Sequence, residues 1–353
     1  MGSVSGSPSF RVVWREDHCE GRHALSSPAR RFPSKGRRAG KHSLLPQKRI
    51  DDMIKTSSNL LYLFSSFQAI SNRCLSFARP HHSCFFFYIF LKRSTIIHMD
   101  MKTFHLSLAS APALVMFRDI PEERAQMGTI LFYHGFGESK DGYPTVLQLL
   151  AEAGFLVVGI DGIGHGERRY PDFHERFPPI APHLIGNMQL EAAFLSVVRE
   201  TAQEVPFILD ALIERGWAHP ERIGIAGHSF GGFVTYAAVV IDKRIQVAAS
   251  VVGSPEWRLP LAESPHLHLD RFFPTALLSQ VAGNDTNVLP AFAQALHHRL
   301  EPYYTQAPKR LRYIEYPNSS HNLIETDWKQ AWEKVARWFL AHLYANKVNG
   351  QPR

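Results

Sequence analysis

Cysteine is scarce in this sequence of 353 residues, and its three cysteines, Cys19, Cys74 and Cys84, all lie near the N-terminus. The rest of the chain therefore has no residues for disulfide bonds or thiolate metal sites. That composition is compatible with a reducing compartment, and we expect a cytoplasmic protein.

Long apolar runs are also missing. The most apolar stretch, Phe85–Leu91, is seven residues long, whereas a membrane-spanning helix needs about 20. The run from Leu60 to Ile70 is interrupted by Ser65, Ser66 and Gln68. No apolar segment near the N-terminus is followed by a small-residue cleavage site, which argues against a secretory signal. We expect no stable insertion into a membrane.

Positive charge is confined to one part of the chain. Residues 1–98 contain 16 Lys and Arg against 5 Asp and Glu, whereas residues 99–353 contain 23 against 27. The formal net charge of +7 therefore belongs to the N-terminal part. The remainder lacks the basic excess and the motifs of nucleic-acid-binding proteins, so we predict no nucleic-acid partner.

The composition changes abruptly at His98. Residues 1–58 are rich in Ser, Gly, Pro, Arg and Lys and have no apolar periodicity, which is typical of disorder. We predict that 1–98 are a disordered or non-native extension, with a natural start at Met99 or Met101. Residues 99–346 then form one domain and 347–353 a tail. The intact mass of the native protein tests this, since a chain that begins at Met1 refutes it.

Apolar runs of strand length alternate with helical patterns along residues 99–346. This alternation predicts an α/β fold with a doubly wound, mostly parallel sheet covered on both faces. Phe104–Leu108 and Ala113–Phe117 are expected as antiparallel edge strands. The other expected strands are Gly128–Tyr133, Phe155–Ile160, Ile223–Ala226, Gln246–Val252, Ala276–Val281 and Leu311–Tyr316, and the expected helices are Thr145–Ala153, Met188–Glu214, Phe230–Ile241, Leu289–Leu300 and Trp328–Tyr344.

The most informative motif is Gly-His-Ser-Phe-Gly-Gly at 227–232, between an expected strand and an expected helix. It matches the G-x-S-x-G pattern, in which a serine occupies a sharp strand-to-helix turn. Glycines flank the serine because the turn is tight and the neighbouring backbone passes close by. Ser229 is therefore the predicted nucleophile.

A serine hydroxyl becomes a strong nucleophile only when a base accepts its proton and an acid orients the base. Two downstream residues follow strands in the order Asp and then His. Asp285 lies in a Gly-containing turn after one strand, and His321 lies in the loop after the last strand. Asp242 and Asp270 are rivals for the acid, but neither follows the appropriate strand. The alternative role of Asp285 is that of an ordinary turn residue, and the alternative role of His321 is that of a capping or surface histidine.

Such chemistry also requires two N–H donors for the oxyanion. The residue after the nucleophile supplies one, which is the backbone N–H of Phe230. The loop after the strand at 128–133 reads His134-Gly135-Phe136, an H-G motif, and we expect Phe136 to supply the other.

With these residues in place, the chain resembles the α/β-hydrolase superfamily, in particular the dienelactone-hydrolase and prolyl-oligopeptidase-like branch with its small bacterial carboxylesterases. The resemblance extends from about Phe104 to Leu343. The residues that carry it are His134-Gly135-Phe136, Asp161–Arg168, Gly227–Gly232, Gly253-Ser254-Pro255, Gly283 and Asp285 with Val288 and Pro290, and His321.

The resemblance implies a serine hydrolase that cleaves short-acyl carboxylic esters through an acyl-enzyme, without a cofactor. Dienelactone hydrolases use a cysteine nucleophile, so Ser229 favours esters. Peptidase members usually carry an N-terminal propeller, which this chain lacks. A serine peptidase or an acyltransferase remains the alternative function, and a homodimer remains possible.

Other residues near these motifs receive less specific predictions. Gly135, His165 and Trp257 are candidates for substrate binding. For His165, as for His228, a structural role is the favoured interpretation. Trp257 is equally explained as a wall of the acyl pocket and as an ordinary core residue. Neither histidine has metal-ligand spacing with carboxylates, so no metal is expected. Asp161 is expected to hold its own loop through backbone hydrogen bonds. The irregular segments 169–187 and 257–274 are candidate lids.

Overall fold

The computed structural model describes residues 101–178, 186–259 and 261–344. The predicted extension 1–98, the tail 347–353 and part of the first candidate lid lie outside the described residues. The domain boundaries expected at 99 and 346 also lie there, so all of these remain predictions.

Eight strands within the described residues form one sheet in the order β1-β2-β4-β3-β5-β6-β7-β8. The pairs β1–β2 and β2–β4 are antiparallel, and all the other pairs are parallel. The two segments predicted as antiparallel strands thus lie at one edge of a parallel sheet, as expected. The strands are β1 (Met101–Leu108), β2 (Ala111–Arg118), β3 (Thr129–Tyr133), β4 (Leu156–Ile160), β5 (Ile223–His228), β6 (Ile245–Val251), β7 (Ala276–Ala282) and β8 (Leu311–Tyr316).

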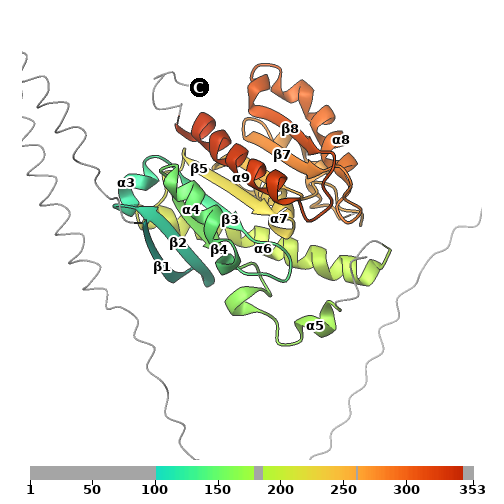
Figure 1. Cartoon of the computed structure of the whole chain (residues 1–353), viewed down its shortest axis with the longest axis horizontal. Coiled ribbons are helices and arrows are strands. Elements are labelled where there is room, and N and C mark those ends of the chain that lie inside the picture. Colours follow the sequence, from blue (N-terminus) through green and yellow to red (C-terminus); the bar gives the residue numbers. More distant parts are fainter. Residues whose placement is uncertain (1–100, 179–185, 260, 345–353) are drawn as a thin grey trace, which may run out of the picture. The chain divides into compact units, whose positions relative to one another are not determined.

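Helices cover both faces of this sheet, and Figure 1 shows α4 and α9 crossing in front of it. The bounds of α4 and α8 lie within one residue of the predicted ones, and α6 and α7 begin and end at the predicted residues. The sequence does not predict the short helices α3 and α5, and α5 lies in a segment expected to be irregular. The α-helices of the described residues are α3 (Pro121–Ala125), α4 (Pro144–Glu152), α5 (Phe173–Arg176), α6 (Met188–Glu214), α7 (Phe230–Ile241), α8 (Pro290–Leu300) and α9 (Glu325–Phe339). None of them is long and apolar enough to span a bilayer.

The last helix departs from its predicted bounds at both ends. It begins at Glu325 rather than Trp328. The prediction missed this first turn because its polar residues, which include Glu325 and Asp327, show no apolar periodicity. Acidic side chains are nevertheless favourable there, since they face the positive end of the helix dipole. The α-helix ends at Phe339 and continues as a π-helical turn to Tyr344.

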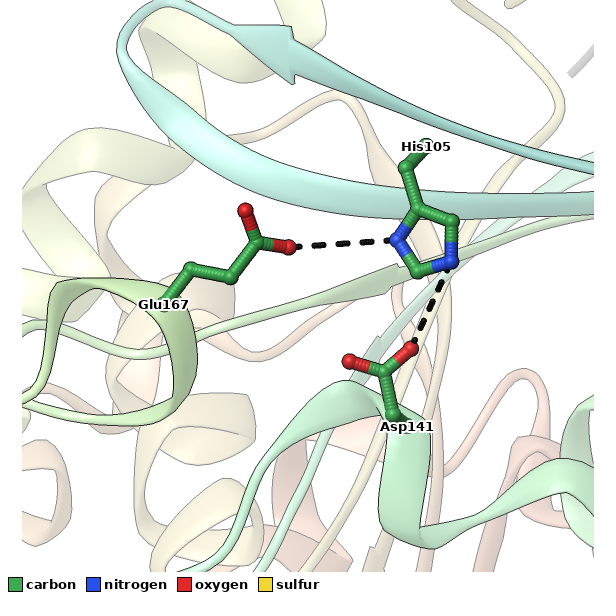
Figure 2. Close-up of side chains that lie close together, drawn as sticks. All are labelled: His105, Asp141 and Glu167. Atoms are coloured by element: carbon green, nitrogen blue, oxygen red, sulfur yellow. Dashed lines mark ion pairs between the residues drawn. The ribbon is translucent and has the colours of Figure 1, made fainter. Parts of the chain in front are cut away.

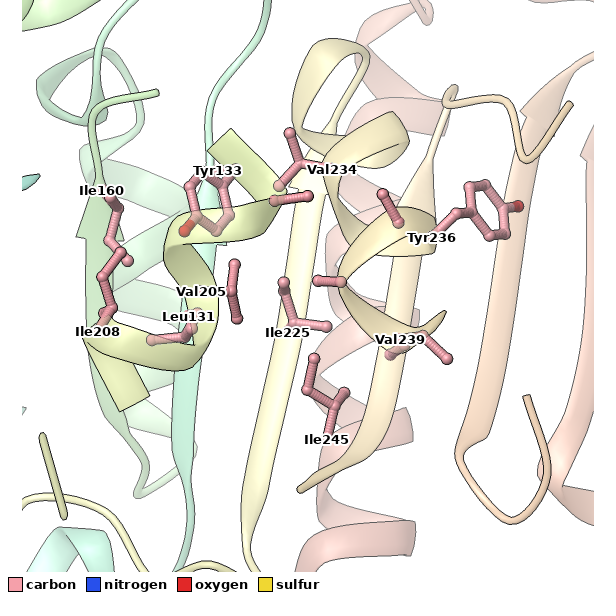
Figure 3. Packing of buried hydrophobic residues seen from close by; sticks show 14 of the residues in the cluster. Leu131, Tyr133, Ile160, Val205, Ile208, Ile225, Val234, Tyr236, Val239 and Ile245 are labelled. Carbon is pink, nitrogen blue, oxygen red and sulfur yellow. The ribbon is translucent and has the colours of Figure 1, made fainter. Parts of the chain in front are cut away.

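The central strands are apolar throughout because alternate side chains enter two different cores. Ile130 and Phe132 of β3 pack into the core with α4 and α9, whereas Leu131 and Tyr133 pack into the core with α6 and α7. Figure 3 shows this second core, with Val205 of α6 and Val239 of α7 directed toward the strands. The two cores confirm the doubly wound α/β architecture.

The parallel strands bring distant loops to one edge of the sheet. Tyr133, the last residue of β3, pairs with Gly227 of β5, and Ala282 of β7 pairs with Tyr316 of β8. The loops that follow β3, β5, β7 and β8 therefore emerge at the same carboxyl edge, where open α/β sheets bind their ligands.

Candidate active site

Ser229 occupies a sharp turn between β5 and α7. Its backbone has φ 51° and ψ −109°, a conformation that residues other than glycine rarely adopt. Its N–H donates to the carbonyl of Val251 at 2.8 Å, which anchors the turn to β6. A Cβ at Gly231 would lie 2.1 Å from the carbonyl oxygen of Tyr133, so only glycine allows this close approach. The sequence pattern thus encodes a strained turn that presents the hydroxyl at the sheet edge.

The structure joins Ser229, His321 and Asp285 in one chain of hydrogen bonds. The Nε2 atom of His321 lies 2.9 Å from Ser229 Oγ, and its Nδ1 lies 2.7 Å from Asp285 Oδ2. The second oxygen of Asp285 accepts the N–H groups of Asn287 at 2.8 Å and Val288 at 2.9 Å. An ionised carboxylate only accepts, so the imidazole proton belongs on Nδ1 and Nε2 is free to accept from Ser229.

The rival aspartates have other surroundings. Asp242 forms an ion pair with Arg244 at 2.6 Å. Asp270 lies in the short 3₁₀ helix Leu269–Arg271 and makes no hydrogen bond with His321. Among the three candidates, the geometry selects Asp285.

The two backbone N–H groups expected to bind an oxyanion belong to Phe136 and Phe230. The N–H of Phe230 belongs to the first residue of α7, where helix geometry leaves N–H groups without a partner and the dipole is positive. Phe136 lies in the loop after β3, and this loop is tied to α7 because the Gly231 N–H donates to the His134 carbonyl at 3.0 Å. Both expected donors therefore belong to segments that meet beside Ser229.

His134 and Gly135 shape the loop that carries Phe136. His134 is buried, its Nδ1 lies 2.7 Å from the Gly135 carbonyl, and its Nε2 accepts the Gly162 N–H at 3.0 Å. Burial lowers the pKa of His134, so the ring is neutral with its proton on Nδ1. The Gly135 N–H donates to Glu138 and Tyr143. That N–H is already engaged and Gly135 does not line the pocket beside Ser229, so a substrate-binding role of Gly135 stays a prediction.

His165 packs against the side chains of Phe136 and Phe230, the two residues expected to donate to the oxyanion. Its ring packs 5.0 Å from Phe136 and 4.8 Å from Phe230, centroid to centroid, and its Nδ1 contacts the Ile163 carbonyl at 2.8 Å. Burial lowers the pKa of His165 to about 4, which keeps the ring neutral. His165 does not line the pocket beside Ser229. Of its two predicted roles, the geometry favours the structural one.

A pocket of about 170 Å³ opens beside Ser229 and His321. Trp257, predicted as a pocket wall, is one of its lining residues, together with Arg258 from the same candidate lid. The described part of the 169–187 segment contributes no lining residue; its Phe173 and Phe177 pack instead against Phe136. The walls that the sequence analysis missed are Glu191, Phe194, Leu195, Phe233, Ser254, Glu256, Asn287, Val288, Leu289 and Phe292.

Asp161 holds its loop as predicted, with a partner that the sequence did not reveal. Its carboxylate accepts the backbone N–H groups of Lys140 and Glu167, each at 2.9 Å, and the Nζ of Lys140 at 3.0 Å. Burial opposes the charge of Lys140, but hydrogen bonds to Glu167, Asp161 and Asp141 outweigh it and raise the pKa. The charged pair ties the loop after β4 to the segment that follows the H-G motif.

The same lysine explains an exposed cluster of His105, Asp141 and Glu167, shown in Figure 2. These three side chains are ligand types that a metal accepts, and His105 lies 3.6 Å from Asp141 and 3.8 Å from Glu167. The Nζ of Lys140 already contacts Asp141 at 3.1 Å and Glu167 at 2.6 Å. A network of ion pairs accounts for the cluster, and the absence of a metal remains a prediction.

Comparison with known proteins agrees with this geometry. The model of the "Alpha/beta hydrolase family" matches residues 130–347, more than half of the chain. The chain belongs to the α/β hydrolase family. It is 23% identical over 266 residues to the "Putative esterase YitV" of Bacillus subtilis (strain 168), an alignment that covers 67% of this chain and 97% of that protein.

Two solved structures have the same fold as this chain. TT1662 from Thermus thermophilus is 21% identical with a TM-score of 0.54, over 68% of this chain and 99% of that one. A Mycobacterium tuberculosis puromycin-hydrolyzing peptidase is 17% identical with a TM-score of 0.51, over 69% of this chain and 40% of that one. The family and the fold that the resemblance implied are thereby confirmed.

This edge of the sheet brings together the Ser229 oxygen, the His321 imidazole within hydrogen-bonding distance of it, the Asp285 carboxylate bonded to the imidazole, and the N-terminus of α7 with the Phe230 N–H. These are the kinds of groups that acyl transfer by a serine requires.

Proposed function

We propose that the protein is a serine hydrolase that cleaves carboxylic esters through an acyl-enzyme. The observation that carries the proposal is the unbroken chain from Ser229 Oγ to His321 to Asp285, with contacts of 2.9 and 2.7 Å. These distances lie within the range over which a base accepts the proton of its nucleophile.

In the first half of the reaction, Ser229 Oγ attacks the ester carbonyl while His321 Nε2 accepts the hydroxyl proton. Asp285 keeps the imidazole in the required tautomer and stabilises its positive charge. The N–H groups of Phe136 and Phe230 donate to the oxyanion. His321 then gives its proton to the departing alcohol, which leaves an acyl group on Ser229.

In the second half, water replaces the alcohol. His321 accepts a proton from the water, the resulting oxygen attacks the acyl carbonyl, and the proton returns to Ser229 as the carboxylic acid departs. No cofactor takes part in this sequence of steps.

The pocket supports a small, apolar acyl group. Its volume is about 170 Å³, and Phe136, Phe194 and Phe233 are among its walls. The relative from B. subtilis is named an esterase, which supports ester cleavage over the alternatives. The structural likeness to a peptidase concerns the fold. Peptidases and acyltransferases of this fold would use the same triad, and that is the argument for either of these alternative activities.

A substrate panel with one variant tests the proposal. We expect turnover of p-nitrophenyl acetate and butyrate, little turnover of peptide anilides, and no preference for added alcohols over water. Ser229→Ala is expected to remain folded by circular dichroism and to lose activity by several orders of magnitude. Unchanged ester turnover in this variant would reject the assignment, and faster cleavage of anilides would favour the peptidase. The cytoplasmic location and a homodimer remain untested predictions.

A further inference from the structure

Three side chains next to the proposed triad form a second hydrogen-bonded chain that the mechanism above does not use. The hydroxyl of Tyr143 contacts Nδ1 of His228 at 2.7 Å, donates to Oε2 of Glu138, and accepts the Gly135 N–H at 3.0 Å. The chain joins the residue before the nucleophile, His228, to the residue before an oxyanion donor, Gly135.

The protons of this chain are fixed by its chemistry. A carboxylate only accepts, so the single hydroxyl proton of Tyr143 goes to Glu138. The contact with His228 then requires that Nδ1–H of the imidazole donates to the Tyr143 oxygen. Burial and the nearby His321 lower the pKa of His228 to about 3, so the ring stays neutral. Burial and Glu138 raise the pKa of Tyr143, which stays protonated.

The chain is anchored in a rigid layer. Tyr143 is 6% exposed and directly precedes α4, and its ring lies 5.0 Å from that of Phe132. The ring of His228 lies 5.0 Å from that of Trp328 in α9. Phe132 belongs to the packed core and Trp328 is half-buried against it. Through Tyr143, the hydrogen bonds therefore link the loop after β3 to the end of β5.

The peptide unit between Gly135 and Phe136 connects these hydrogen bonds to the expected oxyanion donor, the Phe136 N–H. The Gly135 carbonyl and the Phe136 N–H belong to one trans peptide unit and therefore point in opposite directions. The carbonyl is held by His134 Nδ1 at 2.7 Å and by the Glu138 N–H at 3.2 Å. Tyr143 and Glu138 hold the preceding N–H, so the direction of the Phe136 N–H is set from both sides of Gly135.

We propose that Tyr143, with Glu138 and His228, positions the Phe136 N–H relative to Ser229, so that the oxyanion donor is in place before the substrate binds. This inference rests on the proposed function. The three are positioning residues, since they act through Gly135 and the elbow. The neutral His228 also keeps positive charge away from His321, whose ring centre lies 6.4 Å away and becomes cationic during the reaction.

Tyr143→Phe removes the hydroxyl and preserves the ring. We expect kcat on p-nitrophenyl butyrate to fall by about 10- to 100-fold, because a displaced donor stabilises the transition state less, while KM changes by less than about twofold. The affinity for phenylboronic acid, which forms a tetrahedral adduct with the serine, should fall by the same factor as kcat/KM. The exposed Tyr303→Phe is the matched control and should match the wild type in every readout.

Two variants of His228 test the same positioning role if Tyr143→Phe folds poorly. His228→Asn places an N–H close to the position of Nδ1 and should recover most of the boronic-acid affinity. His228→Gln places its amide near Nε2 and should lose affinity as Tyr143→Phe does. Melting temperatures exclude unfolding as the cause.

The outcomes separate this inference from the function itself. A wild-type protein that hydrolyses no ester and binds no boronic acid overturns both. A wild-type esterase whose Tyr143→Phe variant keeps kcat within twofold overturns the positioning role alone. Equal changes in KM and boronic-acid affinity, or equal behaviour of the Asn and Gln variants at 228, also overturn it.

Discussion

Two histidines at the carboxyl edge of the sheet show how the surroundings decide a side chain's role. His321 lies between Ser229 Oγ and the carboxylate of Asp285, and its side chain is 22% exposed. His228 contacts the phenol of Tyr143 and the ring of Trp328, and its pKa is lowered to about 3. In the proposed mechanism His321 becomes cationic, and its carboxylate partner stabilises that charge. His228, beside the buried phenol of Tyr143, stays neutral.

The same contrast separates two buried aspartates. Asp285 accepts two backbone N–H groups and the imidazole of His321. Asp161 accepts two backbone N–H groups and the ammonium of Lys140. In the proposed mechanism the imidazole partner carries the proton between the reacting groups, whereas the ammonium partner fixes the position of a loop. The loops after β7 and β8 therefore hold the proposed proton-transfer groups, and the loops after β3 and β4 are tied together by the buried ion pair.

The largest expected loss of activity comes from removing the proposed base, His321, and it tests the contrast between His321 and His228. His321→Gln should lower kcat by on the order of 10⁵-fold or more, since nothing else accepts the serine proton. The variants of His228 and Tyr143 leave the proposed base in place and should cost far less. Steady-state kinetics on p-nitrophenyl butyrate give both numbers. Comparable losses at 228 and 321 would contradict the assigned roles.

Asp285→Asn should lower kcat by about 10⁴-fold, because an amide that donates to Nδ1 stabilises the wrong tautomer of His321. Its stability should change little, since the amide oxygen still accepts the N–H groups of Asn287 and Val288. Asp270→Asn, at the rejected rival position, is the control and should retain full activity. If Asp270→Asn lost activity and Asp285→Asn did not, Asp270 rather than Asp285 would be the acid of the triad.

Lys140→Met should act on stability rather than on the chemical step. It leaves Asp161 buried without its cation, which costs about 3–5 kcal/mol in the free energy of unfolding. The exposed Lys329→Met should stay within about 0.5 kcal/mol of the wild type. Urea unfolding followed by tryptophan fluorescence measures both, and equal small effects would show that the buried pair is dispensable.

The smallest effect concerns pH. His165 has a folded-state pKa of about 4, below the value near 6.5 of an unfolded histidine. The unfolded chain binds more protons between these values, so the contribution of His165 is complete above about pH 6.5 and is lost as the pH falls toward 4. His165→Phe should reduce the loss of unfolding free energy between pH 7 and pH 5 by about 2 kcal/mol. His298→Gln, at an exposed position, should leave that loss as in the wild type.

The sequence predicts the parts of the site that short motifs encode. The predicted site residues all lie in segments that follow the carboxyl ends of parallel strands, so strand order brings them to one edge. They are Ser229, Asp285, His321, Phe136 and Phe230. The bounds of α6 and α7 follow from their apolar periodicity. The geometry also agrees with the structural role expected of His228 and with the loop-holding role expected of Asp161.

The remaining parts depend on packing that no local pattern records. Tyr143 and Lys140 lie between β3 and α4. Folding of the sheet brings them their distant partners, which are His228 at the end of β5 and Asp161 after β4. Phe194 and Phe233 appear in the sequence as ordinary apolar residues of helices, and the crossing of α6 and α7 turns them into pocket walls. His165 follows a glycine-rich turn like a pocket residue, but aromatic rings enclose it.

Reaction with a fluorophosphonate tests the central claim most directly, because only an activated serine oxygen is phosphonylated rapidly. Peptide mass spectrometry after labelling should place one adduct on Ser229 in the wild type, and labelling should be slowed by orders of magnitude in His321→Gln. An adduct on another residue, or equal labelling of both proteins, would contradict the account.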